Sequence, residues 1–146
     1  MYYIQSEQNK NRTPRIGEVY NMYFDGSGSE QSGWRPGIVF QNNTGNINSP
    51  NIIALPLTSS LKKKYLPTHV VIKAKDTGLK HDSMVLCENP EKMSKEKIGH
   101  YITTLNDMYM KEIAIASLVA SSAVSFISKE DLMFVWEKAI KLNVTA

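Results

Sequence analysis

Three histidines carry the side chain that most often transfers protons at neutral pH, so they come first as candidates for acid–base chemistry. His69 lies inside the apolar run that ends at Ile72, and His81 stands in a turn beside Asp82. His100 precedes a run with strand character. No motif pairs any of them with a nucleophile, so a packing or surface role is the simpler interpretation of each.

The sequence lacks the common catalytic and metal-binding signatures. It has no glycine-rich phosphate loop, no HExxH, no nucleophile elbow and no cysteine–histidine motif. Asp82 and Glu88 could form a carboxylate pair, but they flank a strand and are expected to point to different environments. Cys87 is the single cysteine, which excludes an internal disulfide, and we expect it to be a small buried residue. We expect no cofactor and no metal.

Positive charge is concentrated in one part of the chain. The net charge is only +3, from 17 basic and 14 acidic residues, and alone it does not indicate nucleic-acid binding. Between Lys62 and Lys80, however, there are six lysines and a single acid, Asp76. This excess could attract a polyanion, although a solvated lysine loop is the more common explanation.

Length and composition predict one globular domain. The chain has 146 residues, of which 42% are hydrophobic, and this is enough for one core. Residues 1–15 form a polar leader without the apolar segment of a secretory signal, and we expect a cytoplasmic protein. The longest low-charge stretch, residues 113–127, is shorter than the roughly 20 residues that span a bilayer. It predicts a buried helix, and we expect no membrane contact.

The elements that must position these residues are mainly short strands. Apolar and β-branched runs between turn residues predict strands at 17–24, 35–41, 52–55, 68–72, 83–87 and 102–105. Pro56 interrupts the third run, which predicts an edge position or a bulge around Thr58. Several short strands in series predict a small barrel.

Helical signals lie mostly in the last third of the chain, whereas residues 42–46 have turn chemistry. Residues 94–97 predict a single capped turn, and a longer helix begins near Met108. The residues of that helix expected to face the core are Ile113, Leu118, Val119 and Ala120. A further helix over 128–142 starts with a serine cap and two acids and has lysines near its end, as the helix dipole favours.

Four sequence blocks occur in a fixed order. They are Gly17–Tyr20, Ser29–Pro36 with the following GIVFQNNTGNINSPNIIALPLTSS, Leu66–Val70, and Asp82–Glu88. Together they resemble the MazF/PemK family of toxins from bacterial toxin–antitoxin pairs. The resemblance implies an α+β fold over residues 16–120, an SH3-like small β-barrel with a C-terminal helix. Residues 121–146 would add an extra terminal helix as an extension of the same domain.

The resemblance also implies an activity. Members of this family cleave single-stranded RNA without a metal, form homodimers and are neutralised by a cognate antitoxin protein. The RNA's own 2′-hydroxyl attacks the phosphate, which leaves a 2′,3′-cyclic phosphate and a 5′-hydroxyl. Related barrels poison DNA gyrase instead, and a catalytically silent member that only binds RNA or protein is a third possibility. The Arg-Pro pair and the threonine after the third strand favour the nuclease.

Three residues match catalytic positions of the family. Arg35 would stabilise the charge on the pentavalent phosphorus, because a guanidinium stays protonated and holds two phosphate oxygens at once. Thr58 matches the threonine that contacts the scissile phosphate. Glu30 would act as the base or orient Arg35.

Residues near these positions are candidates for holding the RNA. Trp34 could stack on a base or pack in the core, and Asn42 could contact RNA or simply form a turn. The full set is Ser29, Gln31, Trp34, Asn42, Ser59, Lys62, Lys63 and Lys64. Gly37 stands where the family has a bulkier apolar residue after the Arg-Pro pair, and we expect it to loosen that strand.

Overall fold

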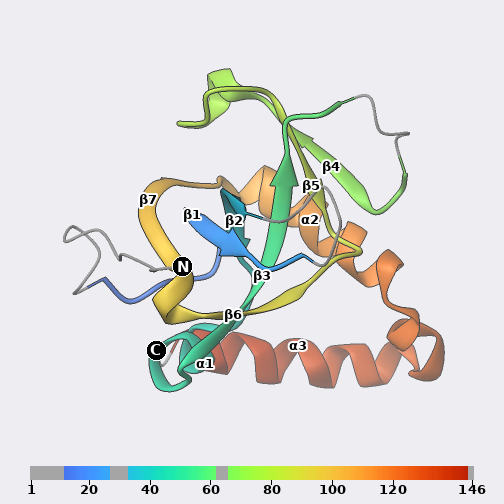
Figure 1. Ribbon diagram of the computed structural model, residues 1–146. Helices are drawn as coiled ribbons and strands as arrows, with labels where there is room; N and C mark the ends of the chain where they lie inside the picture. Colours follow the sequence, from blue (N-terminus) through green and yellow to red (C-terminus); the bar gives the residue numbers. More distant parts are fainter. Residues whose placement is uncertain (1–11, 27–32, 62–65, 145–146) are drawn as a thin grey trace.

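The computed structural model describes residues 12–26, 33–61 and 66–144. The elements, in chain order, are β1 (Glu18–Phe24), β2 (Gly33–Val39), α1 (Asn43–Asn48), β3 (Asn51–Thr58), β4 (His69–Ile72), η2 (Ala74–Asp76), β5 (Ser83–Leu86), β6 (Glu91–Ser94), η3 (Lys95–Lys97), β7 (Ile98–Thr104), α2 (Asp107–Ala120), η4 (Ser122–Phe126) and α3 (Lys129–Val144) (Figure 1). The η elements are short 3₁₀ helices.

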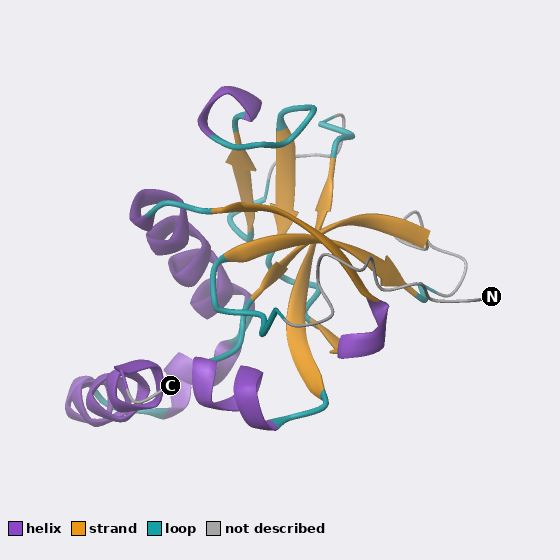
Figure 2. Cartoon of the chain, turned by 90° about the vertical axis from the view of Figure 1, so that its left-hand side faces the viewer, coloured by secondary structure: helices purple, strands orange, loops and turns teal. Residues whose placement is uncertain are grey.

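The described strands form one antiparallel sheet of seven strands, in the order β4-β5-β3-β2-β1-β7, with β6 also paired to β3. Figure 2 shows how strongly this sheet curves, with α2 running along one side of it. The end strands β4 and β7 are not paired with each other in the described part of the chain. The expected α+β class and barrel-like architecture are confirmed, although the barrel is not closed.

Both faces of the sheet carry a hydrophobic core, because successive residues of a strand point to opposite sides. On one face, Val19 and Leu55 belong to a cluster that also includes Ile113 of α2. On the other face, Tyr20 and Met22 belong to a second cluster, to which β6 and β7 contribute. Strands β1 and β3 are therefore buried on both sides over much of their length.

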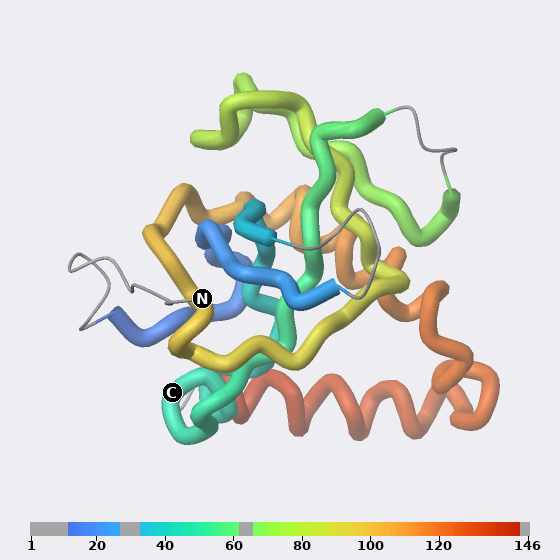
Figure 3. The backbone as a smooth tube through the Cα atoms, in the orientation of Figure 1, coloured from blue at the N-terminus to red at the C-terminus, as the bar shows by residue number. Residues whose placement is uncertain are grey.

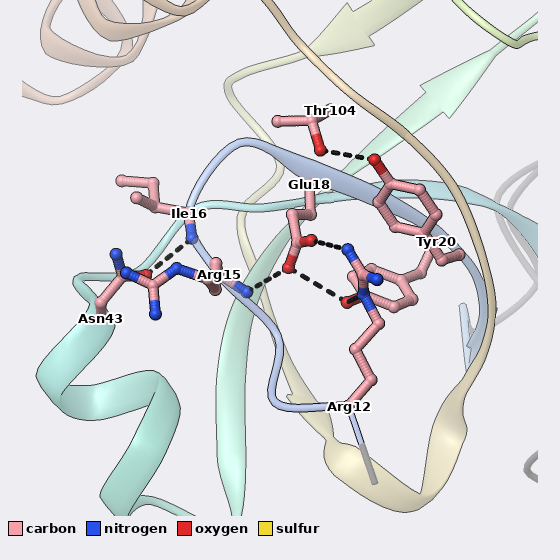
Figure 4. A network of polar contacts seen from close by, with 8 residues as sticks. Arg12, Arg15, Ile16, Glu18, Tyr20, Asn43 and Thr104 are labelled. Carbon is pink, nitrogen blue, oxygen red and sulfur yellow. Dashed lines mark hydrogen bonds and ion pairs between the residues drawn. The ribbon is translucent and has the colours of Figure 1, made fainter. Parts of the chain in front are cut away.

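A polar network ties the N-terminal segment to this second face (Figure 4). The Arg12 guanidinium donates to the Glu18 carboxylate and, through Nε, to the Tyr20 hydroxyl at 2.9 Å, and it lies 3.9 Å above the Tyr101 ring centre. Glu18 also accepts from the Arg15 amide at 2.6 Å and from the Tyr20 hydroxyl at 3.1 Å. We refer to Arg12, Arg15, Glu18, Tyr20 and Tyr101 as the Arg12 network.

The pKa values in the Arg12 network reflect these contacts. The hydrogen bond to Glu18, with a second one to Tyr20, raises the pKa of Arg12. Burial raises the pKa of Tyr20 to about 12, although the hydrogen bond from Arg12 opposes the shift. The charges of Arg12 and Glu18 are therefore paired with each other inside the network.

Pro56 lies inside β3 and does not end it, so the expected edge position is wrong. β3 is an interior strand: β2 pairs with one of its edges, and on the other edge β6 pairs with residues 51–54 and β5 with residues 57–58. Pro56 stands at the junction between those two partners, where a missing backbone N–H is tolerated.

Among the helices and strands that the sequence did not predict are α1 and β6. α1 replaces the turn expected at 42–46: the Asn42 side chain accepts from the Gly45 amide at 2.8 Å, and buried Asn46 donates to the Gln41 carbonyl at 2.9 Å. β6 has a single buried apolar residue, Met93, so no periodic pattern marks it. β7 begins at Ile98, earlier than the run expected at 102–105.

Gly37 does not loosen β2, and that expectation is wrong. A Cβ at Gly37 would lie 2.7 Å from Met22 Sδ and 2.9 Å from Phe24 Cζ. The large side chains of β1 therefore occupy the space that a bulkier residue would fill, and β2 continues through the glycine.

The expected core face of α2 is only partly correct. Ile113 is buried, as predicted, and Ala116 is buried with it. Leu118 and Val119 are 53% and 58% exposed, and Ala120 is also exposed, so these three predictions are wrong. The buried residues Ile113 and Ala116 are one helical turn apart, which places Leu118 and Val119 on other faces of the helix.

The expected terminal helix is present as α3, which runs below the sheet in Figure 1. Its C-terminal end is attached to α1: the Thr44 hydroxyl donates to the Leu142 carbonyl at 2.6 Å, and the Asn143 side chain accepts from the Asn43 amide at 2.9 Å. In the described residues, no helix has the length and apolar character needed to cross a membrane.

Candidate active site

A pocket of about 530 Å³ opens beside the sheet. It is bordered by β1 and β2, by the end of β3, by the loop at residues 78–83, and by β7. In Figure 3 this loop is the yellow-green tube at the top, and β7 is the gold tube at the left. Four of the predicted site residues line the pocket, namely Trp34, Arg35, Thr58 and Ser59.

Arg35 and Thr58 reach the pocket from two neighbouring strands. Arg35 lies in β2 opposite Met22 of β1, and Thr58 is the last residue of β3, opposite Met84 of β5. The Thr58 hydroxyl oxygen accepts from the Ser60 amide at 3.2 Å. In that bond the hydroxyl acts as an acceptor, so its proton remains available to another acceptor. The structure therefore places a guanidinium residue and a hydroxyl residue at one cavity.

The charge of Arg35 also acts on a neighbouring carboxyl group, Glu91 of β6. Burial raises the pKa of Glu91, repulsion from Asp25 adds to this, and the positive charges of Arg35 and Lys97 oppose it. Arg35 thus has an acidic residue within electrostatic reach.

Trp34 is not a core residue, because 42% of it is exposed at the pocket. Its ring packs edge-on against Tyr23, with ring centres 5.6 Å apart, and lies beside Gly99 of β7. A Cβ on Gly99 would lie 3.2 Å from the Trp34 ring. The indole is thereby held in place with part of its surface open to a ligand, and base stacking on it stays a prediction.

The pocket also contains residues that were not among the predicted site residues. His81 and Lys80 come from the loop, His100 comes from β7, and Asn21 comes from β1. His81 and His100 are exposed. No sequence motif identifies His81 and His100 as neighbours, because the loop and β7 come together only in the folded chain.

Other predicted residues lie elsewhere. Asn42 caps α1 and does not line this pocket, which agrees with the turn-forming alternative more than with an RNA contact. The remaining predicted residues lie outside the described part of the chain, and their roles stay predictions: Ser29, Glu30, Gln31, Lys62, Lys63 and Lys64.

The two carboxylates considered as a pair have different partners. Asp82 accepts from the Ala74 amide at 2.7 Å, a bond that lowers its pKa, and Lys73 lies 3.6 Å from it. Glu88 lies 2.7 Å from Nε2 of His69, which is only 4% exposed. The expectation of separate environments is confirmed, and so is the packing role of His69.

Cys87 is buried, as expected, and burial raises the pKa of its thiol to about 11. The described residues contain no group of three or more histidine, cysteine, aspartate or glutamate side chains that could hold a metal ion.

Comparison with known proteins identifies the class to which this fold and pocket belong. A family model described as a PemK-like, MazF-like toxin of type II toxin–antitoxin systems matches residues 15–118. Endoribonuclease EndoA of Bacillus subtilis (strain 168) is 38% identical over 99 residues, which are 68% of this chain and 85% of that protein. The chain therefore belongs to the PemK/MazF toxin family, as its sequence blocks predicted.

Solved structures show the same fold. MazF from Deinococcus radiodurans aligns with a TM-score of 0.64 at 21% identity, covering 75% of this chain and 96% of that one. A mycobacterial endoribonuclease in complex with its cognate antitoxin aligns with a TM-score of 0.61 at 25% identity, covering 73% and 93%. The family match ends at residue 118, so α3 lies beyond it.

Proposed function

We propose that this protein is the toxin of a type II toxin–antitoxin pair and that it cleaves single-stranded RNA at the pocket described above. The observation that carries the proposal is the meeting of Arg35 and Thr58, from two strands, in one cavity of about 530 Å³. A cavity of this size lies within the usual range for ligand pockets, about 300–1,000 Å³. The 38% identity to an endoribonuclease supports the same activity.

In this proposal the RNA supplies its own nucleophile. The 2′-hydroxyl attacks the adjacent phosphate, the bond to the 5′-oxygen breaks, and the products carry a 2′,3′-cyclic phosphate and a 5′-hydroxyl. Arg35 stabilises the negative charge that develops on the phosphorane oxygens, because its fork of N–H groups holds two of them. The Thr58 hydroxyl fixes the position of the phosphate. Trp34, at the edge of the pocket, holds a neighbouring base.

We also propose the partners that such a toxin requires. A cognate antitoxin protein neutralises it by covering the RNA site, and the chain acts as a homodimer. A toxin that cleaves messenger RNA must act where that RNA is, so we place it in the cytoplasm. Light scattering tests the assembly: a dimer mass at micromolar concentration is expected, and a strictly monomeric mass contradicts it.

The test of the activity uses the purified protein and a long single-stranded RNA. We expect cleavage that persists in the presence of a chelator and that yields a 2′,3′-cyclic phosphate and a 5′-hydroxyl. A matched RNA with one 2′-deoxy nucleotide at the cleaved position should resist cleavage at that site alone. Cleavage of the deoxy position, or loss of activity with chelator, contradicts the mechanism. RNA binding without any cleavage contradicts the nuclease itself.

A further inference from the structure

The C-terminal helix α3 carries large apolar side chains that the rest of the chain leaves uncovered. Met133, Phe134 and Trp136 are 59%, 60% and 61% exposed. Among the described side chains of residues 129–143, none is buried, and the helix lies outside the sheet in Figure 1 and Figure 2. A helix of 16 residues is marginal in water by itself, because helices in proteins are stabilised mainly by packing of an apolar face. Uncovered apolar surface of this kind marks an interaction site.

Three of the exposed side chains follow one another along one face of α3. Met133, Trp136 and Ile140 stand at positions i, i+3 and i+7, which lie above one another on a helix. We call these three residues the α3 stripe. Phe134 lies two residues from Trp136, about 200° around the helix, and is therefore on another face. The Lys138 ammonium lies over the Phe134 ring, 4.9 Å from the ring centre.

The charges of α3 argue against a lipid surface or a nucleic acid as the occupant of the stripe. Helices that lie on membranes have a polar face rich in lysine and arginine, and nucleic-acid surfaces need an excess of positive charge. Residues 129–144 have no net charge, because three lysines balance three acids, namely Lys129, Lys138, Lys141, Glu130, Asp131 and Glu137. A partner with balanced charges and an apolar face of its own is required.

The order of the charges makes α3 complementary to a second copy of itself. Glu130 lies near the start of the helix and Lys141 near its end, on the same flank of the stripe. In an antiparallel pair with a two-fold axis at Trp136, this residue meets its own copy. Met133 then lies beside Ile140 of the other helix. Glu130 lies beside Lys141 of the other helix, and each contact occurs twice. A parallel pair would instead bring like charges together.

We propose that the α3 stripe is an interface between two copies of this chain, which pack α3 against α3 in antiparallel order. Trp136 is the anchor of this interface, since tryptophan is among the residues that most often carry binding energy at the centre of an interface. The inference goes beyond the homodimer proposed above, because α3 lies beyond the residues that the family model matches. It does not depend on RNA cleavage.

The direct test places the photo-crosslinking amino acid p-benzoylphenylalanine at Trp136 of the full chain and, as a matched control, at Phe134. The two positions are about equally exposed but lie on different faces of the helix. Because the crosslinker is aromatic, it keeps much of the bulk of the side chain that it replaces. On irradiation we expect a covalent dimer from position 136 and little from position 134.

A second measurement gives the strength of the contact, by sedimentation over a dilution series. W136A should weaken self-association at least about 10-fold, because it removes the central aromatic anchor, whereas F134A should change it less than about 2-fold. Both variants should keep the wild-type urea midpoint, since both side chains are exposed.

Charge reversal tests the antiparallel order. K141E places an acid beside Glu130 of the other copy and should weaken self-association about 3-fold or more. E130K/K141E puts opposite signs back together and should return self-association to within about 2-fold of the wild type. Both differences should shrink at high salt, because the pairs are at the surface.

Several results overturn the inference. Equal crosslinking from positions 136 and 134, no crosslinking from either, or unchanged self-association in W136A means that the copies do not meet at the stripe. A double variant no better than K141E contradicts the antiparallel order. Crosslinking of position 136 to a co-expressed antitoxin alone, or binding to anionic vesicles that W136A abolishes, gives the stripe another occupant.

These failures are distinct from failure of the proposed function. A wild-type dimer that does not crosslink at position 136 contradicts the α3 contact and leaves the homodimer intact. A strictly monomeric wild type contradicts both. A wild-type chain that cleaves no RNA contradicts the nuclease and leaves the α3 contact standing.

Discussion

The pocket and the Arg12 network use neighbouring residues of the same two strands, β1 and β7. In β1, Tyr20 belongs to the network and Asn21 lines the pocket; in β7, Tyr101 belongs to the network and His100 lines the pocket. Each region also contains an arginine and aromatic rings. Successive residues of a strand point to opposite sides, which separates these neighbours.

What differs is how the polar groups are used. In the Arg12 network, one carboxylate, Glu18, accepts from a guanidinium, a backbone amide and a hydroxyl, and it is 5% exposed. In the pocket, a guanidinium residue, a hydroxyl residue and two imidazoles border a cavity with no acid among the described lining residues. The charges of Arg12 and Glu18 are paired within the fold, whereas the described lining of the pocket has cations and no acid, which is the lining that the proposed phosphate site requires.

The largest effect should follow from R35A. Cleavage should slow by at least about 100-fold, because one preorganised charge donor is removed, while the chain should remain folded. R35K should restore little, since an ammonium cannot reproduce the bidentate fork. Single-turnover kinetics and urea unfolding measure the two quantities. If R35A unfolded enough of the protein to explain the slower cleavage, Arg35 would be stabilising the fold, as the Arg12 network does, and the pocket and the network would not differ in role.

E18Q should give the reverse result. It removes the charge that holds Arg12 and weakens three hydrogen bonds of a buried group, so we expect a loss of about 2–3 kcal/mol in unfolding free energy. The cleavage rate per folded molecule should stay within about 2-fold of the wild type. A large loss of rate at full stability would show that the network takes part in the reaction.

G37A should affect both regions, because Gly37 is two residues from Arg35 in β2 and pairs with Tyr20 of the Arg12 network in β1. The added methyl would meet Met22 and Phe24 at under 3 Å, and overpacking of this kind costs about 1–3 kcal/mol. Since β2 must shift to admit it, the cleavage rate per folded molecule should also fall. An unchanged urea midpoint would mean that the β1 side chains can move aside freely.

The smallest effect should be seen with Y20F at high pH. Tyr20 has a pKa of about 12 in the folded chain against an ordinary value of 10.0, so its ionisation favours the unfolded chain. Its contribution is complete below pH 10 and is lost as the pH rises from 10 toward 12. Y20F should lose about 1 kcal/mol at neutral pH and show a flatter decline in this range. If the unfolding free energy of Y20F and of the wild type fell equally between pH 10 and 12, the decline would come from groups other than Tyr20.

Arg35 and Thr58 were predicted as site residues from the resemblance of their sequence blocks to a known family, and the structure places both at one pocket. Arg35 and Thr58 lie in compact blocks, and each block carries its own strand, so their positions relative to β2 and β3 follow from the chain itself. His81 and His100 are 19 positions apart in an order that carries no motif. They line one pocket because the loop at residues 78–83 packs near β7, where a Cβ on Gly78 would lie 3.2 Å from the Ile102 carbonyl oxygen. A contact between segments distant in the sequence leaves no local pattern.

The same limit explains the errors in the fold. α1 is built from asparagines whose side chains bond to the backbone, so its sequence reads as a turn. β6 and the interior position of Pro56 depend on which strand pairs with each part of β3. The residues of a strand do not by themselves specify its pairing partner. The exposed residues Leu118 and Val119 have core-like composition, but burial depends on where α2 meets the sheet.

The most direct test of the pocket as the RNA site uses the three histidines as reporters. The full chain, labelled in its imidazoles, is titrated by NMR with a single-stranded RNA that carries one 2′-deoxy nucleotide at the cleaved position and so binds without being cut. We predict that the ring signals of His81 and His100 shift with the binding curve, while those of buried His69 stay fixed. Saturated binding with no change at His81 and His100, or a change confined to His69, would contradict the account.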